Sequence, residues 1–215
     1  MNISDIKETL GNRSPRIMEI KKENAVFLPI IEWNGELSLL FEVRSDTLKH
    51  QPGEVCFPGG RREEGETLKE CACRETAEEL GIHEEDIEIY GQFDTLHNYT
   101  NVTIHTFIGT ISKKAINLLN FDNSGKADYI SNLGEVKELF LVPISFFQNK
   151  KPYVYPFAVK PQIKEDFPYY MLNSPEKYKW LEGEYTVPIF HYKKYVIWGM
   201  TARILCHFME EFKIG

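Results

Sequence analysis

Two apolar runs joined by Asn34-Gly35 place the strongest limit on how this chain can fold. "AVFLPIIEW" covers residues 25–33 and "ELSLLFEV" covers residues 36–43. Both runs are rich in the β-branched and aromatic residues that favour strands. Asn-Gly between two such runs is the strongest short signal for a β-hairpin, because a type I′ turn needs positive φ at both positions. The sequence therefore predicts a β-sheet that begins with an antiparallel hairpin.

Helices and further strands follow in an irregular order. Residues 45–65 are rich in Pro, Gly and charge and are predicted to be a loop. A helix is predicted over 67–80, with Gly81 as its C′ residue. The remaining predicted elements are strands at 87–96, 102–111 and 135–144 and an amphipathic helix at 199–212. Because the βαβ rhythm of a parallel sheet is missing, the predicted fold class is α/β in the broad α+β sense, with a mixed sheet and packed helices.

Composition excludes several classes of protein. The chain has 215 residues, of which 42% are apolar, so it can bury a substantial core, and the lack of repeats or linkers favours a single domain over 1–215. A formal net charge of −7 gives no reason to expect nucleic-acid binding. No membrane-spanning run or signal-peptide pattern is present, so a cytoplasmic protein is expected. The four cysteines lack zinc-site spacing and are expected to be reduced.

The segment "RETAEELGI" (74–82) gathers three carboxylates on the predicted helix. Glu75, Glu78 and Glu79 have the spacing i, i+3 and i+4, so they form one patch beside the core-facing stripe, although like charges at this spacing repel. A patch of this kind is usually a solvated helix face. The residues around it favour a functional interpretation.

The sequence from Gly60 to Ile82 resembles the signature of the Nudix hydrolases, G-x5-E-x7-R-E-U-x-E-E-x-G-U, where U is aliphatic. Gly60, Glu66, Arg74-Glu75, Glu78-Glu79 and Gly81 stand at its fixed positions, and the one departure is Thr76 at the first U. The resemblance implies an α/β/α sandwich and hydrolysis of a nucleoside diphosphate linked to another group. Such a pyrophosphate repels an attacking hydroxide, so Mg²⁺ or Mn²⁺ on hard oxygen ligands is expected as cofactor.

The resemblance also implies roles for the box residues. Glu75 and Glu79 are the expected metal ligands, with Glu78 a further ligand or the general base and the Gly60 carbonyl completing the shell. Glu66 and Arg74 are expected to form an orienting pair. Asp94 and His97 are alternative bases on a later loop, although a solvated Asp and a structural His are the simpler interpretations.

A second resemblance covers residues 39–60, "LLFEVRSDTLKHQPGEVCFPGG". It is similar to the extra motif of coenzyme A diphosphatases within the Nudix family, roughly LLTxRSxxLRxxxGxVxFPGG, with Phe41 taken in place of Thr and Lys49 in place of Arg. This implies coenzyme A or a derivative as substrate. Arg44 and Lys49 are the predicted anion-binding pair for its phosphates, and Gly59 is predicted to let the backbone approach the substrate.

Other substrates and other roles stay open. ADP-ribose or a dinucleoside polyphosphate is the nearer alternative, and a non-catalytic nucleotide-binding regulator is the more distant one. In each case the expected partner is a small-molecule nucleotide. The N-terminal extension 1–23 and the segments 112–134 and 152–192 resist interpretation. The last two are considered as parts of the pocket or of a homodimer contact.

Overall fold

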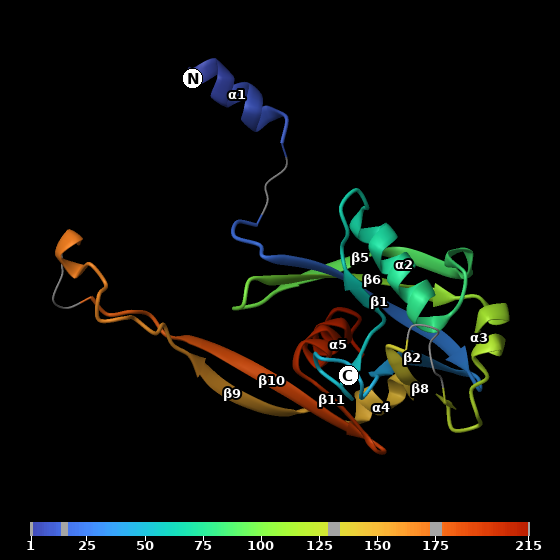
Figure 1. Cartoon of the computed structure of the whole chain (residues 1–215). Helices are drawn as coiled ribbons and strands as arrows, with labels where there is room; N and C mark the ends of the chain where they lie inside the picture. Colours follow the sequence, from blue (N-terminus) through green and yellow to red (C-terminus); the bar gives the residue numbers. More distant parts are fainter. Residues whose placement is uncertain (1, 14–16, 129–133, 173–177, 215) are drawn as a thin grey trace.

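The computed structural model describes residues 2–13, 17–128, 134–172 and 178–214, and a mixed sheet forms its centre (Figure 1). Its strands, in spatial order, are β5 (Ile87–His97), β6 (Val102–Ile111), β1 (Lys22–Trp33), β2 (Glu36–Arg44), β8 (Val136–Pro143) and β7 (Lys126–Asp128). Short strand β3 (Val55–Cys56) pairs with β2, and β4 (Gly59–Arg61) pairs with β1. Because β1 and β6 are parallel while β1 and β2 are antiparallel, the predicted mixed sheet is confirmed.

The β1–β2 hairpin turns where the sequence predicts. Asn34 and Gly35 have φ angles of 51° and 79°, and Trp33 pairs with Glu36 across the turn. This two-residue turn fixes the register, and side chains along each strand then alternate between the two faces of the sheet. Phe27 on β1 consequently faces the opposite layer from its neighbour Leu28.

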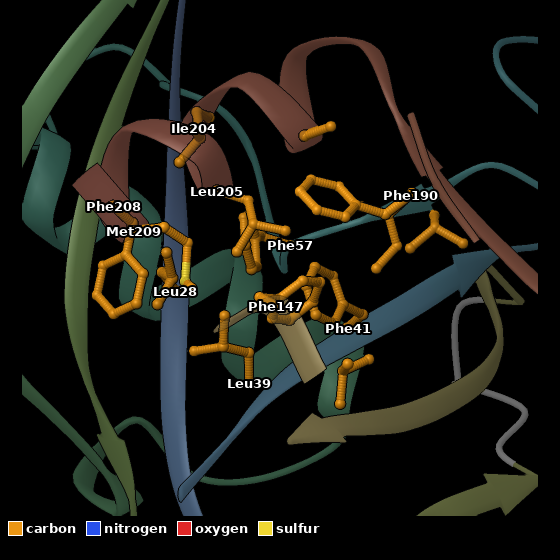
Figure 2. Close-up of a cluster of buried hydrophobic side chains, with 14 of the residues drawn as sticks. Leu28, Leu39, Phe41, Phe57, Phe147, Phe190, Ile204, Leu205, Phe208 and Met209 are labelled. Carbon is orange, nitrogen blue, oxygen red and sulfur yellow. The ribbon is translucent and has the colours of Figure 1, made fainter. Parts of the chain in front are cut away.

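Helices cover both faces of the sheet, which confirms the predicted α/β/α sandwich. On one face, α2 (Leu68–Leu80) and α3 (Lys113–Leu119) contribute to a buried cluster with Phe27 and Leu40. On the other face, α4 (Ile144–Asn149) and α5 (Gly199–Glu211) contribute to a second cluster. Figure 2 shows its side chains, including Leu28, Phe41, Leu205 and Phe208. Burying each such side chain stabilises the fold by about 1.5–3 kcal/mol.

The segment 152–192, which the sequence left uninterpreted, contributes most of a second, three-stranded sheet. Strands β9 (Tyr153–Val159), β10 (Gly183–Tyr192) and β11 (Tyr195–Trp198) form it, and short helix η2 (Tyr169–Met171) lies between β9 and β10. We call residues 153–192 the β9–β10 arm, because they extend away from the central sheet (Figure 1). Residues 173–177 of the arm lie outside the described residues.

Three other segments were also not predicted in detail. The N-terminal extension contains α1 (Ile3–Gly11), which begins with a capping box between Asn2 and Asp5 and has no buried residue. The segment 112–134 contains α3 and β7, and its residues 129–133 lie outside the described part, as do 14–16 of the extension. Short helix η1 (Glu84–Asp86) links α2 to β5. Among the described helices, none has both the length and the hydropathy for a membrane span.

Candidate active site

Helix α2 holds the carboxylate-rich box in a fixed register. It starts after Thr67, whose side-chain oxygen accepts a hydrogen bond from the Glu70 N–H at 3.2 Å while the Glu70 carboxylate accepts one from the Thr67 N–H at 2.7 Å. Such a cap stabilises a helix by about 1 kcal/mol. Gly81 ends the helix in the left-handed conformation at φ 62°. Both ends agree with the sequence prediction.

Gly59 and Gly60 let the backbone lie against the box carboxylates. A Cβ added to Gly59, which has φ of +144°, would meet the Ala25 carbonyl oxygen of β1 at 2.3 Å. A Cβ added to Gly60 would meet the carboxyl carbon of Glu75 at 2.3 Å. The first glycine therefore allows β4 to pair closely with β1, and the second makes room for Glu75. The Gly60 carbonyl accepts a weak hydrogen bond from the Cys71 thiol at 3.8 Å.

Glu79 is buried, which corrects the predicted position of the carboxylate patch. The sequence placed all three box acids beside the core-facing stripe, but Glu79 is only 3% exposed, whereas the Glu78 side chain is 45% exposed. The buried stripe of α2 consists of Cys71, Ala72, Thr76, Glu79 and Leu80. Cys73 and Ala77, two other apolar residues of the helix, are only partly buried. Glu79 turns its Oε2 to the Gly59 N–H, which donates a hydrogen bond at 2.8 Å.

Arg74 binds three carboxylates at once. Its Nε and Nη2 donate to Oε2 and Oε1 of Glu66 at 3.1 and 2.9 Å, which is the bidentate geometry that guanidinium groups favour. Its Nη1 lies 3.0 Å from Glu75 Oε1 and 3.3 Å from Glu78 Oε2. The hydrogen bonds from Arg74 lower the pKa of Glu66 to about 2. Arg74 therefore fixes the positions of acids on both the loop and the helix.

Glu42, which the sequence interpretation did not single out, is the acid most completely removed from solvent. It is 0% exposed on β2, and its Oε1 accepts a hydrogen bond from the Cys56 thiol at 3.1 Å. Strand alternation places Glu42 on the same face as Leu40, which contributes to the cluster beneath α2. Burial raises the pKa of Glu42 to about 7, and burial followed by the charge of Glu42 raises the pKa of Glu79 well above its usual range.

Glu42 and Glu79 form a buried carboxyl pair. Oε2 of Glu42 has no hydrogen-bond partner when both groups are ionised, because two carboxylates offer no donor between them. Burial is the largest effect on the pKa of Glu42, and the interaction with the Glu79 carboxyl is among the smaller effects that lower it. Two like charges buried near each other disfavour ionisation of both groups, so a bound proton or a cation would stabilise the pair.

The alignment of the second motif needs one correction. When the pattern LLTxRS is counted back from Arg44-Ser45 without a gap, the threonine position falls on Glu42, and Phe41 stands at the second leucine position. When Phe41 is aligned with the threonine of the pattern instead, Glu42 falls on the unspecified position x. That alignment therefore hides Glu42. Its signal in the sequence is an acid two residues before Arg44 on the same face of a strand.

Arg44 and Lys49 lie in different surroundings. Arg44 is partly buried, its Nε is buried without a hydrogen-bond partner, and its charge lowers the pKa of both Glu42 and Glu79 against the larger effect of their burial. Lys49 is exposed on the loop between β2 and β3. The charge of Arg44 therefore acts on the buried acids, and its pairing with Lys49 stays a prediction.

The alternative bases have other partners. Asp94 lies 2.6 Å from His207 Nε2 of α5, and His97 shares a hydrogen bond with Thr103 of the adjacent strand at 2.8 Å. The charge of Glu135, which comes just before β8, does act on acids of the candidate site. After the larger effect of burial, it is among the influences that raise the pKa of Glu42 and Glu75. Glu135 is thus a further acid that sequence spacing did not reveal.

The donor set suits a divalent cation of the Mg²⁺ type. In the described part of the chain, no group of three or more His, Cys, Asp or Glu side chains has the arrangement of a metal site. Glu75 is engaged by Arg74, and Glu79 by the Gly59 N–H. Nevertheless, the buried acids supply only hard oxygen atoms, and Glu42 Oε2 lacks a partner. Oxygen ligands and uncompensated negative charge are what Mg²⁺ and Mn²⁺ require.

Comparison with known proteins identifies the family. Residues 21–157 match the NUDIX domain family, so the chain belongs to the Nudix hydrolases. The chain is 33% identical over 148 residues to the peroxisomal coenzyme A diphosphatase NUDT7 of Mus musculus, a match that covers 68% of this chain and 57% of that protein. It is 31% identical over 148 residues to the peroxisomal coenzyme A diphosphatase ndx-8 of Caenorhabditis elegans, covering 66% of this chain and 58% of that protein.

Each of these matches spans little more than half of the relative's length. Among solved structures, a mutT/nudix family protein from Listeria innocua is 19% identical with a TM-score of 0.42, over 64% of this chain and 84% of that one. Both relatives carry a peroxisomal name, so the expected cytoplasmic location of this chain stays a prediction.

Proposed function

We propose that this chain is a pyrophosphohydrolase that uses Mg²⁺ or Mn²⁺ to cleave coenzyme A or a derivative into adenosine 3′,5′-bisphosphate and 4′-phosphopantetheine. The observation that carries the proposal is the contact of two box acids with the glycine backbone: Glu79 accepts from the Gly59 N–H at 2.8 Å, and Glu75 occupies the space left by the missing Cβ of Gly60. This contact puts carboxylates beside a backbone that a phosphate chain can approach closely.

In this proposal Glu75 and Glu79 hold the metal, and the Gly60 carbonyl is a further ligand. When bound, the ion supplies positive charge to the phosphates and lowers the pKa of water. Glu78, whose side chain is 45% exposed, is proposed to take the proton from the attacking water, and its role as a ligand is the alternative. The water oxygen bonds to one phosphorus, and the bond from that phosphorus to the bridging oxygen breaks.

Arg74 and Glu66 position the acids in this scheme. Arg74 contacts Glu66, Glu75 and Glu78 together, so its loss releases a metal ligand and the base at the same time. A carboxylate that must both bind metal and orient water tolerates little displacement, because small misplacements of catalytic groups are costly. Their proposed role is therefore orientation, separate from the chemical step.

The substrate assignment rests on the second motif and on the names of the two relatives. The motif resembles that of coenzyme A diphosphatases over residues 39–60, and both relatives bear that name. Arg44, Lys49 and Gly59 are proposed to contact the substrate, with the two basic side chains binding phosphate groups outside the metal centre.

One observation favours the alternative substrates. The charge of Arg44 lowers the pKa of Glu42 and Glu79, so it acts partly inside the protein and is less available to bind a 3′-phosphate. ADP-ribose or a dinucleoside polyphosphate, which lack that phosphate, are therefore the second candidates. The intact set of box acids disfavours a non-catalytic regulator, because a binding module has no need of them.

A substrate panel tests the proposal. The purified chain is assayed with coenzyme A, dephospho-coenzyme A, ADP-ribose and diadenosine tetraphosphate, each with Mg²⁺ and with Mn²⁺. The expected result is the highest kcat/KM for coenzyme A. A clear preference for ADP-ribose would replace the substrate assignment, and absence of hydrolysis of all four compounds would contradict the enzyme assignment.

We extend the proposal to a homodimer formed through the β9–β10 arm. Tyr153, Tyr155 and Tyr170 of the arm are 65%, 55% and 81% exposed, and exposed apolar surface of this kind is typical of contact surfaces. A Tyr155→Ser, Tyr170→Ser double variant should then shift the mass measured by light scattering from dimer to monomer. Tyr90→Ser on β5, where the side chain is 62% exposed, is the control. A wild-type monomer would refute the extension.

A further inference from the structure

We propose that Glu42 is an additional metal ligand of this chain and that it binds one divalent cation together with Glu79. The inference rests on the proposed metal-dependent function and adds to it a residue outside the signature. It follows from the position of Glu42 on β2, from its complete burial and from the oxygen atom that the protein leaves without a partner.

The geometry gives Glu42 one satisfied oxygen and one unsatisfied oxygen. Oε1 accepts from the Cys56 thiol at 3.1 Å, whereas Oε2 is buried without a hydrogen-bond partner. The side chain is 0% exposed, so bulk water does not solvate it. An ionised carboxylate in such a place is strongly destabilising unless a cation or donors compensate it. A cation between Glu42 and Glu79 would compensate both groups.

A second buried glutamate shows what a structural acid in this sheet looks like. Glu138 on β8 is 6% exposed, and it accepts hydrogen bonds from Lys194 Nζ at 2.8 Å and from the Tyr195 hydroxyl. Lys126 Nζ lies 3.4 Å from the same carboxylate. Glu138 is therefore fully compensated by the protein. Glu42 has a weak thiol donor and the charge of Arg44, but no ion pair in the described structure.

The location of Glu42 also favours a place in the proposed metal site. Cys56, its donor, lies three residues before Gly59, whose N–H binds Glu79. Residues 56–59 thus link the two acids, because Cys56 donates a hydrogen bond to Glu42 and Gly59 donates one to Glu79. Glu42 also stands where the coenzyme A diphosphatase pattern has threonine, so this chain places a charged ligand where the pattern has a neutral hydroxyl.

Manganese titration calorimetry on four proteins tests the assignment: wild type, Glu42→Gln, Glu42→Asp and the compensated control Glu138→Gln. The proposal expects Mn²⁺ affinity to fall at least about tenfold in Glu42→Gln, a loss of about 1.4 kcal/mol. Glu42→Asp keeps the charge but shortens the side chain, so a ligand role predicts that affinity falls there too. Glu138→Gln should bind Mn²⁺ like wild type. Glu64→Gln on the exposed loop is a second control in case Glu138→Gln does not fold.

The outcomes separate this inference from the proposed function. Wild-type affinity in Glu42→Gln overturns the inference and leaves the function standing. If Glu42→Gln loses Mn²⁺ affinity but Glu42→Asp binds Mn²⁺ like wild type, Glu42 acts through its charge and is not a ligand. A wild-type protein that binds no Mn²⁺ removes the metal-dependent function and the inference together. Thermal denaturation supplies the second readout: Mn²⁺ should raise the Tm of wild type more than that of Glu42→Gln, and equal increases overturn the proposal.

Discussion

Replacing Gly60 by alanine should remove activity while leaving the fold nearly unchanged. The added Cβ would lie 2.3 Å from the carboxyl carbon of Glu75 and 2.4 and 2.5 Å from its two oxygens, whereas ordinary contact begins at 3.4 Å. The Glu75 carboxylate must therefore retreat by about 1 Å, and a displacement of that size at a catalytic centre costs about 100-fold in rate. Because Glu75 is a flexible side chain and Gly60 does not have positive φ, the backbone can stay in place.

Two further glycine variants make this prediction specific. Gly91→Ala adds a Cβ with nothing within 4 Å, so it should keep both activity and Tm. Gly59→Ala collides with the Ala25 carbonyl oxygen at 2.3 Å and has φ of +144°, so it should lower the Tm as well as the activity. The assay is steady-state hydrolysis of coenzyme A together with thermal denaturation of each variant. A Gly60→Ala enzyme with near wild-type kcat/KM would refute the reasoning that Glu75 must occupy this space.

Three other predictions concern charged side chains, two of them single residues and one a pair. Glu79→Gln should cut turnover by at least about 100-fold and weaken Mn²⁺ binding while the fold stays intact. The control Glu64→Gln should leave turnover and Mn²⁺ binding unchanged. An active Glu79→Gln enzyme would exclude Glu79 from the site. The pKa of Glu66 is lowered from 4.5 to about 2, so its contribution to stability is present above pH 4.5 and is lost as pH falls toward 2. Between pH 4.5 and 2, the free energy of unfolding of Glu66→Gln should consequently fall less steeply than that of wild type. Superimposable curves of unfolding free energy against pH would contradict this. An Arg44→Ala, Lys49→Ala double variant should discriminate less than wild type between coenzyme A and dephospho-coenzyme A, and unchanged discrimination would place the 3′-phosphate elsewhere.

The parts of the fold that the sequence predicts well depend on local chemistry. Asn34-Gly35 determines a turn between two strands, and Gly81 determines where α2 ends, because few other residues adopt positive φ. The α/β/α arrangement came from the family resemblance, and the mixed sheet came from the irregular order of the predicted strands and helices. The β9–β10 arm was not predicted, because its aromatic residues are exposed and therefore do not give the apolar pattern of a strand with one buried face.

The candidate site was predicted in its residue types but not in its burial. The signature indicated the box acids, yet a small rotation of α2 places Glu79 in the core-facing stripe and leaves Ala77 partly exposed. Helical periodicity alone cannot resolve such a rotation, because the contacts of the helix, such as that of Glu79 with the Gly59 N–H of β4, are not local in the sequence. Glu42 was not identified because the second motif was aligned one residue out of register, and its neighbours Cys56 and Glu79, which belong to two other elements, gave no local signal.

Product analysis in ¹⁸O-labelled water tests the central claim most directly. The wild-type enzyme is incubated with coenzyme A and Mg²⁺ or Mn²⁺, and the products are identified by mass spectrometry. Hydrolysis at the pyrophosphate predicts adenosine 3′,5′-bisphosphate and 4′-phosphopantetheine. One ¹⁸O atom should be present in either the 5′-phosphate or the 4′-phosphate and none elsewhere, and no products should form after chelation of the metal. Cleavage at the 3′-phosphate or within the pantetheine arm, or full turnover in the presence of chelator, would contradict the account.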